Sequence, residues 1–350
     1  MDASAFAPLS SLRACAAQCV MVRLGSHLPP VTTAEDDAER VQRLLASTPV
    51  GGVIVFRASA TGSNAIAHTL MRLQDASNVP LLVASDVERG VGQQVQGATR
   101  FPHAQALANT ADPEAAAAAL ARETAREARA CGIHLAFAPV ADVNTCTTNP
   151  IIGTRAFGST PGPVSRCVRA YVQAAQRAGL GTTAKHFPGH GRTEADSHAT
   201  LPTVAASPEA LAAVDVPPFQ AAIEAGVDAI MTAHVAYPTL GANAPATASR
   251  VLLHDRLREA MGFNGLVVSD SLRMDGIRDV SPAALLAAGV DLLLDPEDAA
   301  AVVNAVVDAV HNGWLSERRL REACDRVLAL KRTVHRRWGE AAFAPPGFAP

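Results

Sequence analysis

The sequence is poor in aromatic residues: its 350 residues include two tryptophans, two tyrosines and ten phenylalanines, 4% of the chain. A long cleft that holds a polymer by stacking needs many aromatic rings, because each ring supplies a large flat apolar surface. So few rings argue against such a cleft and favour a short pocket for a small molecule.

Cysteine motifs, excess basic charge and long apolar runs are missing too. The six cysteines (15, 19, 131, 146, 167 and 324) form no CxxC pair, which predicts reduced thiols and no disulfide framework. A net charge of −3 and a pI of about 6.4 argue against nucleic acid or an anionic membrane surface as partner. No run of about 18 apolar residues predicts a membrane span, and the acidic N-terminus does not resemble a secretion signal. We expect a cytoplasmic monomer with no membrane or nucleic-acid partner.

Several catalytic signatures are also absent. No GxGxxG follows a predicted strand, which argues against a dinucleotide, and we expect no cofactor. No GxSxG motif presents a nucleophilic serine, and Cys131 and Cys146 have no basic neighbour that would favour a thiolate. The first predicted strand, 19–24, lacks the HxH sequence of metal-dependent amidohydrolase barrels.

The chain does contain a regular alternation of strand and helix patterns. The strands are continuous apolar runs, typical of parallel strands buried on both faces. Strands are predicted over 19–24, 51–56, 79–86, 134–143, 181–186, 228–234, 265–270 and 290–295. Helices are predicted over 10–18, 34–47, 64–76, 113–130, 163–178, 216–225, 253–261, 282–288, 299–311 and 316–337. This pattern predicts an α/β fold, a single (β/α)8 TIM-type barrel over 1–340 with no second domain, followed by a C-terminal tail over 341–350.

Polar residues stand where five of these strands end. They are Asp86, Asp142 with Asn144, Lys185 with His186, His234, and Asp270. The C-terminal ends of the strands of such a barrel meet on one face, so these residues are expected to converge there. The pattern predicts an enzyme that acts on a polar small molecule.

The densest polar group is the segment 185–198, KHFPGHGRTEADSH. Its proline and two glycines exclude a helix, so a loop that presents polar side chains is predicted. Asp196 can orient His198 and raise its pKa, which suits a proton shuttle near neutral pH, although Asp196 also fits a turn. Asp270 ends an apolar strand, where a carboxylate is costly to bury unless it is paired or used.

A zinc site is an alternative for the same segment, with His186, His190, Asp196 and His198 as ligands. The spacing of His186 and His190 would suit a helix, which the intervening Pro-Gly forbids. The spacing therefore fits zinc only loosely, and no metal is expected.

Taken in order, the motifs resemble those of glycoside hydrolase family 3, and in particular its single-domain β-N-acetylglucosaminidases. The similar stretches extend over almost the whole chain: 86–94 (DVERGVGQQ), 137–144 (FAPVADVN), 149–158 (NPIIGTRAFG), 185–198, 231–235 (MTAHV), 245–247 (PAT) and 265–274 (GLVVSDSLRM).

The resemblance implies a retaining mechanism with two displacements. Asp270 would be the nucleophile, and His198, paired with Asp196, would be the acid/base. The family pattern also implies that sugar hydroxyls are held by four further residues: Asp86, Arg155, Lys185 and His186.

Two departures from the family pattern affect this site. Ser271 follows the nucleophile where many relatives have a second aspartate, so a neighbouring carboxylate is lost. The early loop reads Glu-Arg-Gly-Val-Gly where many relatives read Glu-Gly-Gly-Arg, so Arg89 is displaced. Of the properties that the resemblance implies, the leaving-group preference is the one that these two changes affect most.

The implied activity is that of an exo-β-N-acetylglucosaminidase that removes terminal N-acetylglucosamine from muropeptides or chitooligosaccharides, with a role in peptidoglycan recycling. A phosphorylase that transfers the sugar to phosphate and a β-glucosidase are alternatives on the same fold. A sugar-binding barrel without activity and a metal-dependent hydrolase are alternatives from other classes. The intact Asp270, Asp196 and His198 argue against the inactive barrel.

Overall fold

The computed structural model describes residues 9–58, 63–194 and 201–339 and contains a barrel of eight parallel strands. The strands are β1 (Val20–Leu24), β2 (Gly52–Val55), β3 (Leu82–Ser85), β4 (Leu135–Ala136), β5 (Gly181–Phe187), β6 (Ala229–Thr232), β9 (Leu266–Val268) and β10 (Leu293–Leu294). They pair in the order β10-β1-β2-β3-β4-β5-β6-β9, and a parallel bridge between Val268 and Leu292 joins the two ends. The predicted (β/α)8 barrel is confirmed.

Each strand is buried on both faces, as its continuous apolar sequence predicts. In β3, Leu82 and Ala84 lie in the cluster that fills the barrel, whereas Val83 lies in the cluster between strands and helices. This arrangement is possible because successive side chains of a strand point to opposite faces.

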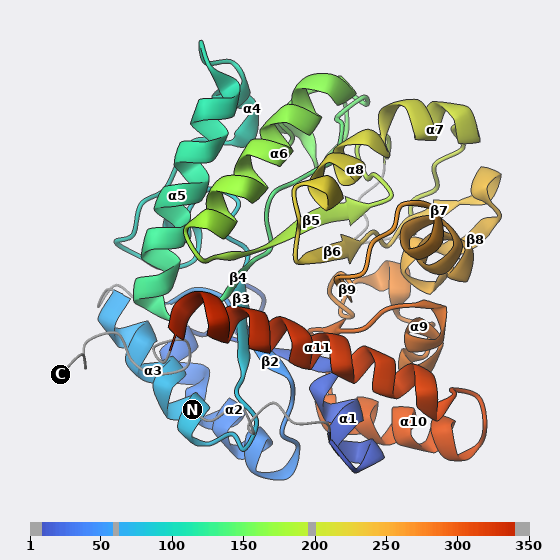
Figure 1. Ribbon diagram of the computed structural model, residues 1–350. Coiled ribbons are helices and arrows are strands. Elements are labelled where there is room, and N and C mark those ends of the chain that lie inside the picture. The colour runs from blue at the N-terminus through green and yellow to red at the C-terminus, as the bar shows by residue number, and fades with distance from the viewer. Residues whose placement is uncertain (1–8, 59–62, 195–200, 340–350) are drawn as a thin grey trace.

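Helices surround the barrel (Figure 1). Ten of them were predicted: α1 (Leu12–Gln18), α2 (Ala34–Ser47), α3 (Ser63–Asp75), α5 (Pro113–Cys131), α6 (Pro161–Arg177), α8 (Pro217–Glu224), the π-helical segment η6 (Val251–Ala260), α9 (Pro282–Ala288), α10 (Ala299–His311) and α11 (Glu317–Trp338). Several of these helices, such as α2, α5 and α11, begin at a side-chain cap. The Asp112 side chain, for example, accepts a hydrogen bond from Ala115 N at the start of α5, whose first residue is a proline.

The last helix closes one end of the barrel. Four residues of α11, Val327, Leu330, Val334 and Trp338, pack into the cluster that fills the barrel interior, and α11 lies across the front of the molecule in Figure 1. Trp338 Nε1 donates to Gly179 O at 2.7 Å, at the N-terminal end of β5. Because α11 occupies this end, the opposite end, where the strands finish, is left for a site.

The structure adds short elements that the sequence patterns did not predict. They are α4 (Ala104–Ala108), α7 (Pro208–Val214) and the antiparallel pair β7 (Ala236–Tyr237) and β8 (Ala242–Pro245). Such elements are too short to show a period of their own. Lys185 and His186, the last residues of the predicted strand 181–186 and the first of the predicted loop segment, lie within β5, which extends to Phe187.

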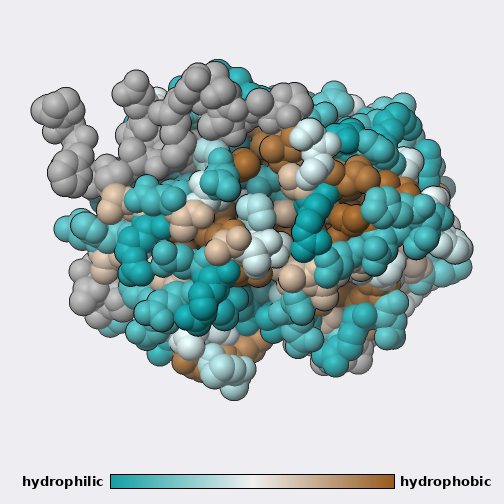
Figure 2. Space-filling view, turned by 90° about the horizontal axis from the view of Figure 1, so that it is seen from below, coloured by the Kyte–Doolittle hydropathy of each residue, from teal (hydrophilic) through white to brown (hydrophobic). Residues whose placement is uncertain are grey.

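No helix in the described ranges is long and apolar enough to cross a membrane. The face shown in Figure 2 carries hydrophobic residues in several patches separated by hydrophilic ones.

Candidate active site

The ends of the strands line a cavity of about 400 Å³, and a neighbouring cavity of about 420 Å³ shares Asp86 and Asp270 with it. Asp86 follows β3, Lys185 and His186 belong to β5, and Asp270 follows β9. Arg155, in the short helix η3 (Gly153–Arg155) of the loop after β4, reaches the same cavity. The structure thus brings together five of the seven predicted site residues. The other two, Asp196 and His198, lie outside the described residues.

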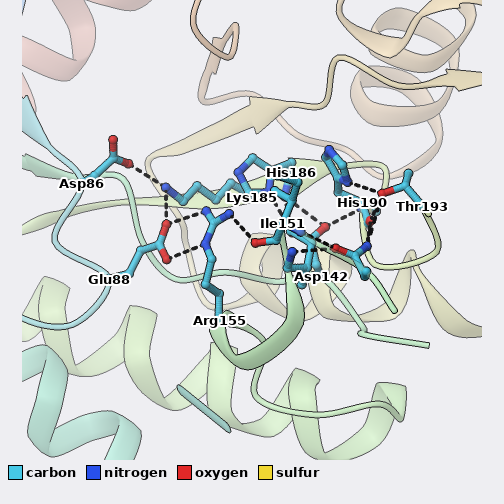
Figure 3. Close-up of polar contacts among 12 residues, drawn as sticks. Asp86, Glu88, Asp142, Ile151, Arg155, Lys185, His186, His190 and Thr193 are labelled. Atoms are coloured by element: carbon cyan, nitrogen blue, oxygen red, sulfur yellow. Dashed lines mark hydrogen bonds and ion pairs between the residues drawn. The ribbon is translucent and has the colours of Figure 1, made fainter. Parts of the chain in front are cut away.

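Lys185 is the centre of an ion-pair network on one wall of this cavity (Figure 3). Its ammonium lies 2.7 Å from Asp86 Oδ1 and 2.7 Å from Glu88 Oε1, and its side chain is 3% exposed. Arg155 donates to both oxygens of Glu88, at 2.9 and 2.7 Å. The two cations therefore fix two carboxylates at the wall, and free lone pairs of these carboxylates can accept hydrogen bonds from hydroxyl groups.

Glu88 was not identified from the sequence, although it lies two residues after Asp86. Burial raises the pKa of Glu88, but the charges of Arg155 and Lys185 outweigh burial and hold it well below its usual value. The pKa of Lys185 is raised, because Asp86 and Glu88 outweigh its burial. The sequence did contain a signal for Glu88. It is a second acid two residues after a predicted site acid, and the two predicted site cations, Lys185 and Arg155, need acidic partners.

Asp142 holds the turn that follows β5. It accepts hydrogen bonds from His186 N at 3.2 Å and from His190 N at 2.6 Å, and His186 Nδ1 lies 2.8 Å from its Oδ2. The carboxylate is buried, so these contacts fix the His186 ring toward the cavity. Gly191 permits the close packing of this turn, since an added Cβ would lie 1.9 Å from Val143 O.

Asp270 lies at the end of β9 in a setting that favours its charged form. Ser271 N donates to its Oδ1 at 2.7 Å. Burial raises the pKa of Asp270, but nearby His186 and His234, the Ser271 N–H and Lys185 together lower it. An ionised carboxylate that lines a cavity is available as a nucleophile.

A second network anchors the loop that carries Asp270. Asp295, at the end of β10, accepts from Ser271 Oγ at 2.9 Å and from Arg273 Nε at 3.2 Å. Arg23, from β1, binds both oxygens of Asp295, at 2.7 and 2.5 Å. Ser271, the residue that departs from the family pattern, therefore connects the loop to a buried carboxylate of the next strand. The sequence marked Asp295 only as the end of a strand.

The described residues contain no group of three or more histidine, cysteine or acidic side chains arranged to hold a metal ion. His186 and His190 lie with their ring centroids 5.8 Å apart, and His186 is engaged with Asp142. The other two residues of the zinc alternative, Asp196 and His198, are among those not described.

Comparison with known families gives a match over nearly the whole chain. The model described as "Glycosyl hydrolase family 3 N terminal domain" matches residues 11–330. The chain belongs to glycosyl hydrolase family 3.

Individual family 3 proteins agree with this assignment. A β-N-acetylglucosaminidase/β-glucosidase of Cellulomonas fimi is 37% identical over 317 residues, which cover 86% of this chain and 56% of that protein. A β-hexosaminidase of Idiomarina loihiensis is 35% identical over 286 residues, 79% of this chain and 84% of that protein. The solved structure of a glycoside hydrolase family 3 β-N-acetylglucosaminidase from Paenibacillus sp. str. FPU-7 superposes with a TM-score of 0.88 at 34% identity, over 98% of this chain and 65% of that chain. The chain thus spans less than two thirds of the first and third of these family 3 relatives.

Proposed function

We propose that this family 3 barrel is a retaining exo-β-N-acetylglucosaminidase that removes terminal N-acetylglucosamine from muropeptides or chitooligosaccharides. The observation on which the proposal rests is Asp270, a carboxylate with a lowered pKa that lines a cavity whose opposite wall carries Asp86, Glu88, Arg155 and Lys185. A retaining glycosidase needs such a carboxylate nucleophile beside groups that bind the sugar hydroxyls. The relatives named for this activity supply the sugar class.

In the proposed mechanism an oxygen of Asp270 attacks the anomeric carbon and forms a glycosyl ester. The glycosidic bond breaks, and the leaving oxygen takes a proton from His198, which Asp196 orients. His198 then removes a proton from water, and the resulting hydroxide releases the sugar with its original anomeric configuration.

The hydroxyl-binding wall assists this chemistry by holding the ring in place. Asp86 and Glu88 accept hydrogen bonds from sugar hydroxyls, while Lys185 holds both acids in place and Arg155 binds Glu88. Hydrogen bonds of this kind strengthen as the ring gains positive charge in the transition state, where they contribute several kcal/mol. A cavity of about 400 Å³ lies near the small end of ligand sites, which span roughly 300–1,000 Å³. This size suits a single terminal sugar.

Hydrolysis of p-nitrophenyl β-N-acetylglucosaminide, measured beside the β-glucoside, tests the proposal. We expect faster release from the N-acetyl substrate, loss of release in Asp270→Ala, and no effect of a chelator. Release from the glucoside alone would contradict the sugar class but keep the nucleophile. A dependence on added phosphate, with sugar 1-phosphate as product, would favour the phosphorylase, and loss of activity with the chelator would favour the metal-dependent hydrolase.

A further inference from the structure

Two arginines at the edge of the cavity have no acidic partner in the described part of the chain. Arg89 and Arg100 both line the cavity. Arg89 is half-buried and uses its Nε to donate to Phe101 O at 3.0 Å, and Arg100 is exposed. Their terminal guanidinium groups are thus available to a ligand that enters the cavity.

The charges on this wall do not balance without such a ligand. Lys185 and Arg155 are matched by Asp86 and Glu88, which leaves the two arginines as surplus positive charge. Both arginines line the same cavity; burial and the charge of Arg100 lower the pKa of Arg89, and Glu88 opposes this effect.

His103 adds a third polar group beside these arginines. It lines the same cavity, and its Nδ1 is buried without a hydrogen-bond partner in the structure as described. Burial, together with Arg89 and Arg100, lowers the pKa of His103, so the ring is neutral near pH 7 and can still contribute a hydrogen bond. A buried nitrogen without a partner is costly, and a bound ligand would remove that cost.

The position of Arg89, Arg100 and His103 in the barrel indicates which part of a bound sugar they would contact. Arg89 follows β3, which is four strands from β9 in the ring of eight and therefore lies opposite Asp270. A pyranose with its anomeric carbon at Asp270 presents its far ring carbons to the β3 side. Arg89 stands where the early loop departs from the Glu-Gly-Gly-Arg pattern of many relatives.

We infer that Arg89, Arg100 and His103 bind an anionic substituent, a carboxylate or a phosphate ester, on a ring carbon remote from the anomeric centre. The inference rests on the proposed function, because it assumes that the sugar lies between Asp270 and the β3 side. It names the substrate class more closely: the terminal N-acetylglucosamine unit carries an added acidic group, as it does in N-acetylglucosamine 6-phosphate or in N-acetylmuramic acid. Arginine suits this role because its planar donors match carboxylate and phosphate oxygens in pairs.

Calorimetric binding of free sugars to the full chain tests the inference without requiring turnover. The ligands are N-acetylglucosamine, its 6-phosphate, N-acetylmuramic acid, which carries a carboxylate on its 3-oxygen, and inorganic phosphate. We expect at least one acidic sugar to bind about tenfold or more tighter than N-acetylglucosamine, as charge-assisted hydrogen bonds predict. Tighter binding of the 6-phosphate would indicate a site for a phosphate ester, and tighter binding of N-acetylmuramic acid a site for a carboxylate.

The variants Arg89→Gln and Arg100→Gln should each reduce this preference about tenfold. Arg89→Lys, which keeps the charge but not the paired donors, should reduce it less. Arg43→Gln, an exposed arginine on α2, is the matched control and should leave it unchanged, and equal melting temperatures would show that all variants fold.

Two results would overturn the inference: neutral N-acetylglucosamine binding as tightly as both acidic sugars, or inorganic phosphate binding as tightly as the sugar phosphate. Hydrolysis of the neutral p-nitrophenyl substrate is measured in parallel. Intact hydrolysis without a preference for acidic sugars contradicts only this inference, whereas a preference without hydrolysis of any substrate contradicts only the proposed function.

Discussion

The Lys185 side chain is almost entirely buried, and its ammonium forms ion pairs with two carboxylates, those of Asp86 and Glu88. Asp86 is 27% and Glu88 10% exposed at the side chain. When one member of a buried ion pair is removed, the remaining charge stays in a medium that solvates it poorly. An intact network is therefore needed for the stability of this wall as well as for the proposed binding of the sugar.

We expect Lys185→Met to lower kcat/KM at least a hundredfold and the free energy of unfolding by about 3 kcal/mol, the lower end of the range for breaking a buried pair. Urea unfolding and hydrolysis assays measure the two effects. Arg318→Met, which breaks the exposed Arg318–Glu322 pair, is the control and should cost less than about 1 kcal/mol. Equal small losses in both variants would contradict the network's role.

The sequence identified the residues of this site that end strands or stand in recognisable motifs. Asp86, Lys185 and Asp270 were found in this way, because apolar runs mark where each strand stops. Glu88 and Asp295 were missed, because their importance comes from partners distant in sequence: Glu88 bridges to Arg155, and Asp295 to Arg23. A pattern within one segment does not reveal such pairing.

At the scale of elements, the turn after β5 depends on a neighbouring loop. Asp142, from the loop after β4, accepts hydrogen bonds from two backbone N–H groups of the turn. Tyr237, in the unpredicted strand β7, supports the same turn by donating its hydroxyl proton to Gly189 O at 2.7 Å. The sequence predicted the turn itself, but neither of its supports.

Asp142→Asn should lower kcat about tenfold or more, because its amide group would place N–H donors against the N–H groups of His186 and His190. KM should rise as well, since the His186 ring loses the partner that fixes it. Steady-state kinetics give both values, and a circular dichroism melt checks folding. Kinetics indistinguishable from the unsubstituted protein would contradict the positioning role of Asp142.

The same turn predicts a dependence of stability on pH. Burial and the charge of His186 lower the pKa of His190 from 6.5 to about 4. Between these values the unfolded chain binds more protons than the folded chain, so stability falls as the pH falls through this window. At 1.36 kcal/mol per unit the loss is roughly 3 kcal/mol by pH 4.

Urea unfolding at several pH values between 4 and 7 measures this loss. His190→Gln removes the titrating ring, so its unfolding free energy should fall less over the same window. An equal fall in both proteins would show that His190 is not responsible.

For the whole molecule, the closure of the barrel by α11 leaves a lysine in the interior. Lys331 is fully buried, and its ammonium donates to Gln18 Oε1 at 2.5 Å. Burial lowers the pKa of Lys331 from 10.5 to about 7. Between pH 7 and 10.5 the unfolded chain binds more protons, so this lysine makes the fold more stable as the pH rises through that window.

Lys331→Met should therefore stabilise the protein at pH 7, although most substitutions of buried residues destabilise. Each unit by which burial lowers the pKa of Lys331 costs the folded protein up to about 1.4 kcal/mol, and methionine removes this cost. The lost hydrogen bond to Gln18 costs roughly 1 kcal/mol. We therefore expect a net gain of about 1–3 kcal/mol in the free energy of unfolding. Chemical unfolding at pH 7 and pH 10 measures this gain, which should shrink at the higher pH. Destabilisation at both values would contradict the account.

The barrel itself was predictable because its eight buried strands appear in the sequence as continuous apolar runs, alternating with helix patterns. The closure of the barrel was harder to predict. The sequence predicted α11 as a helix but did not show that it packs against the N-terminal end of the barrel, where the rings of Trp338 and His134 lie with their centroids 5.0 Å apart.

Asp270 is proposed to form a covalent bond with the sugar, and this bond can be trapped and observed. The protein is mixed with a fluorinated N-acetylglucosaminide whose glycosyl-enzyme forms faster than it breaks down, and its intact mass and peptides are then measured. We expect one added sugar per chain, on the peptide that contains Asp270, and none in Asp270→Ala. A sugar attached to another residue, or a product released with inverted anomeric configuration and no adduct, would contradict this proposal.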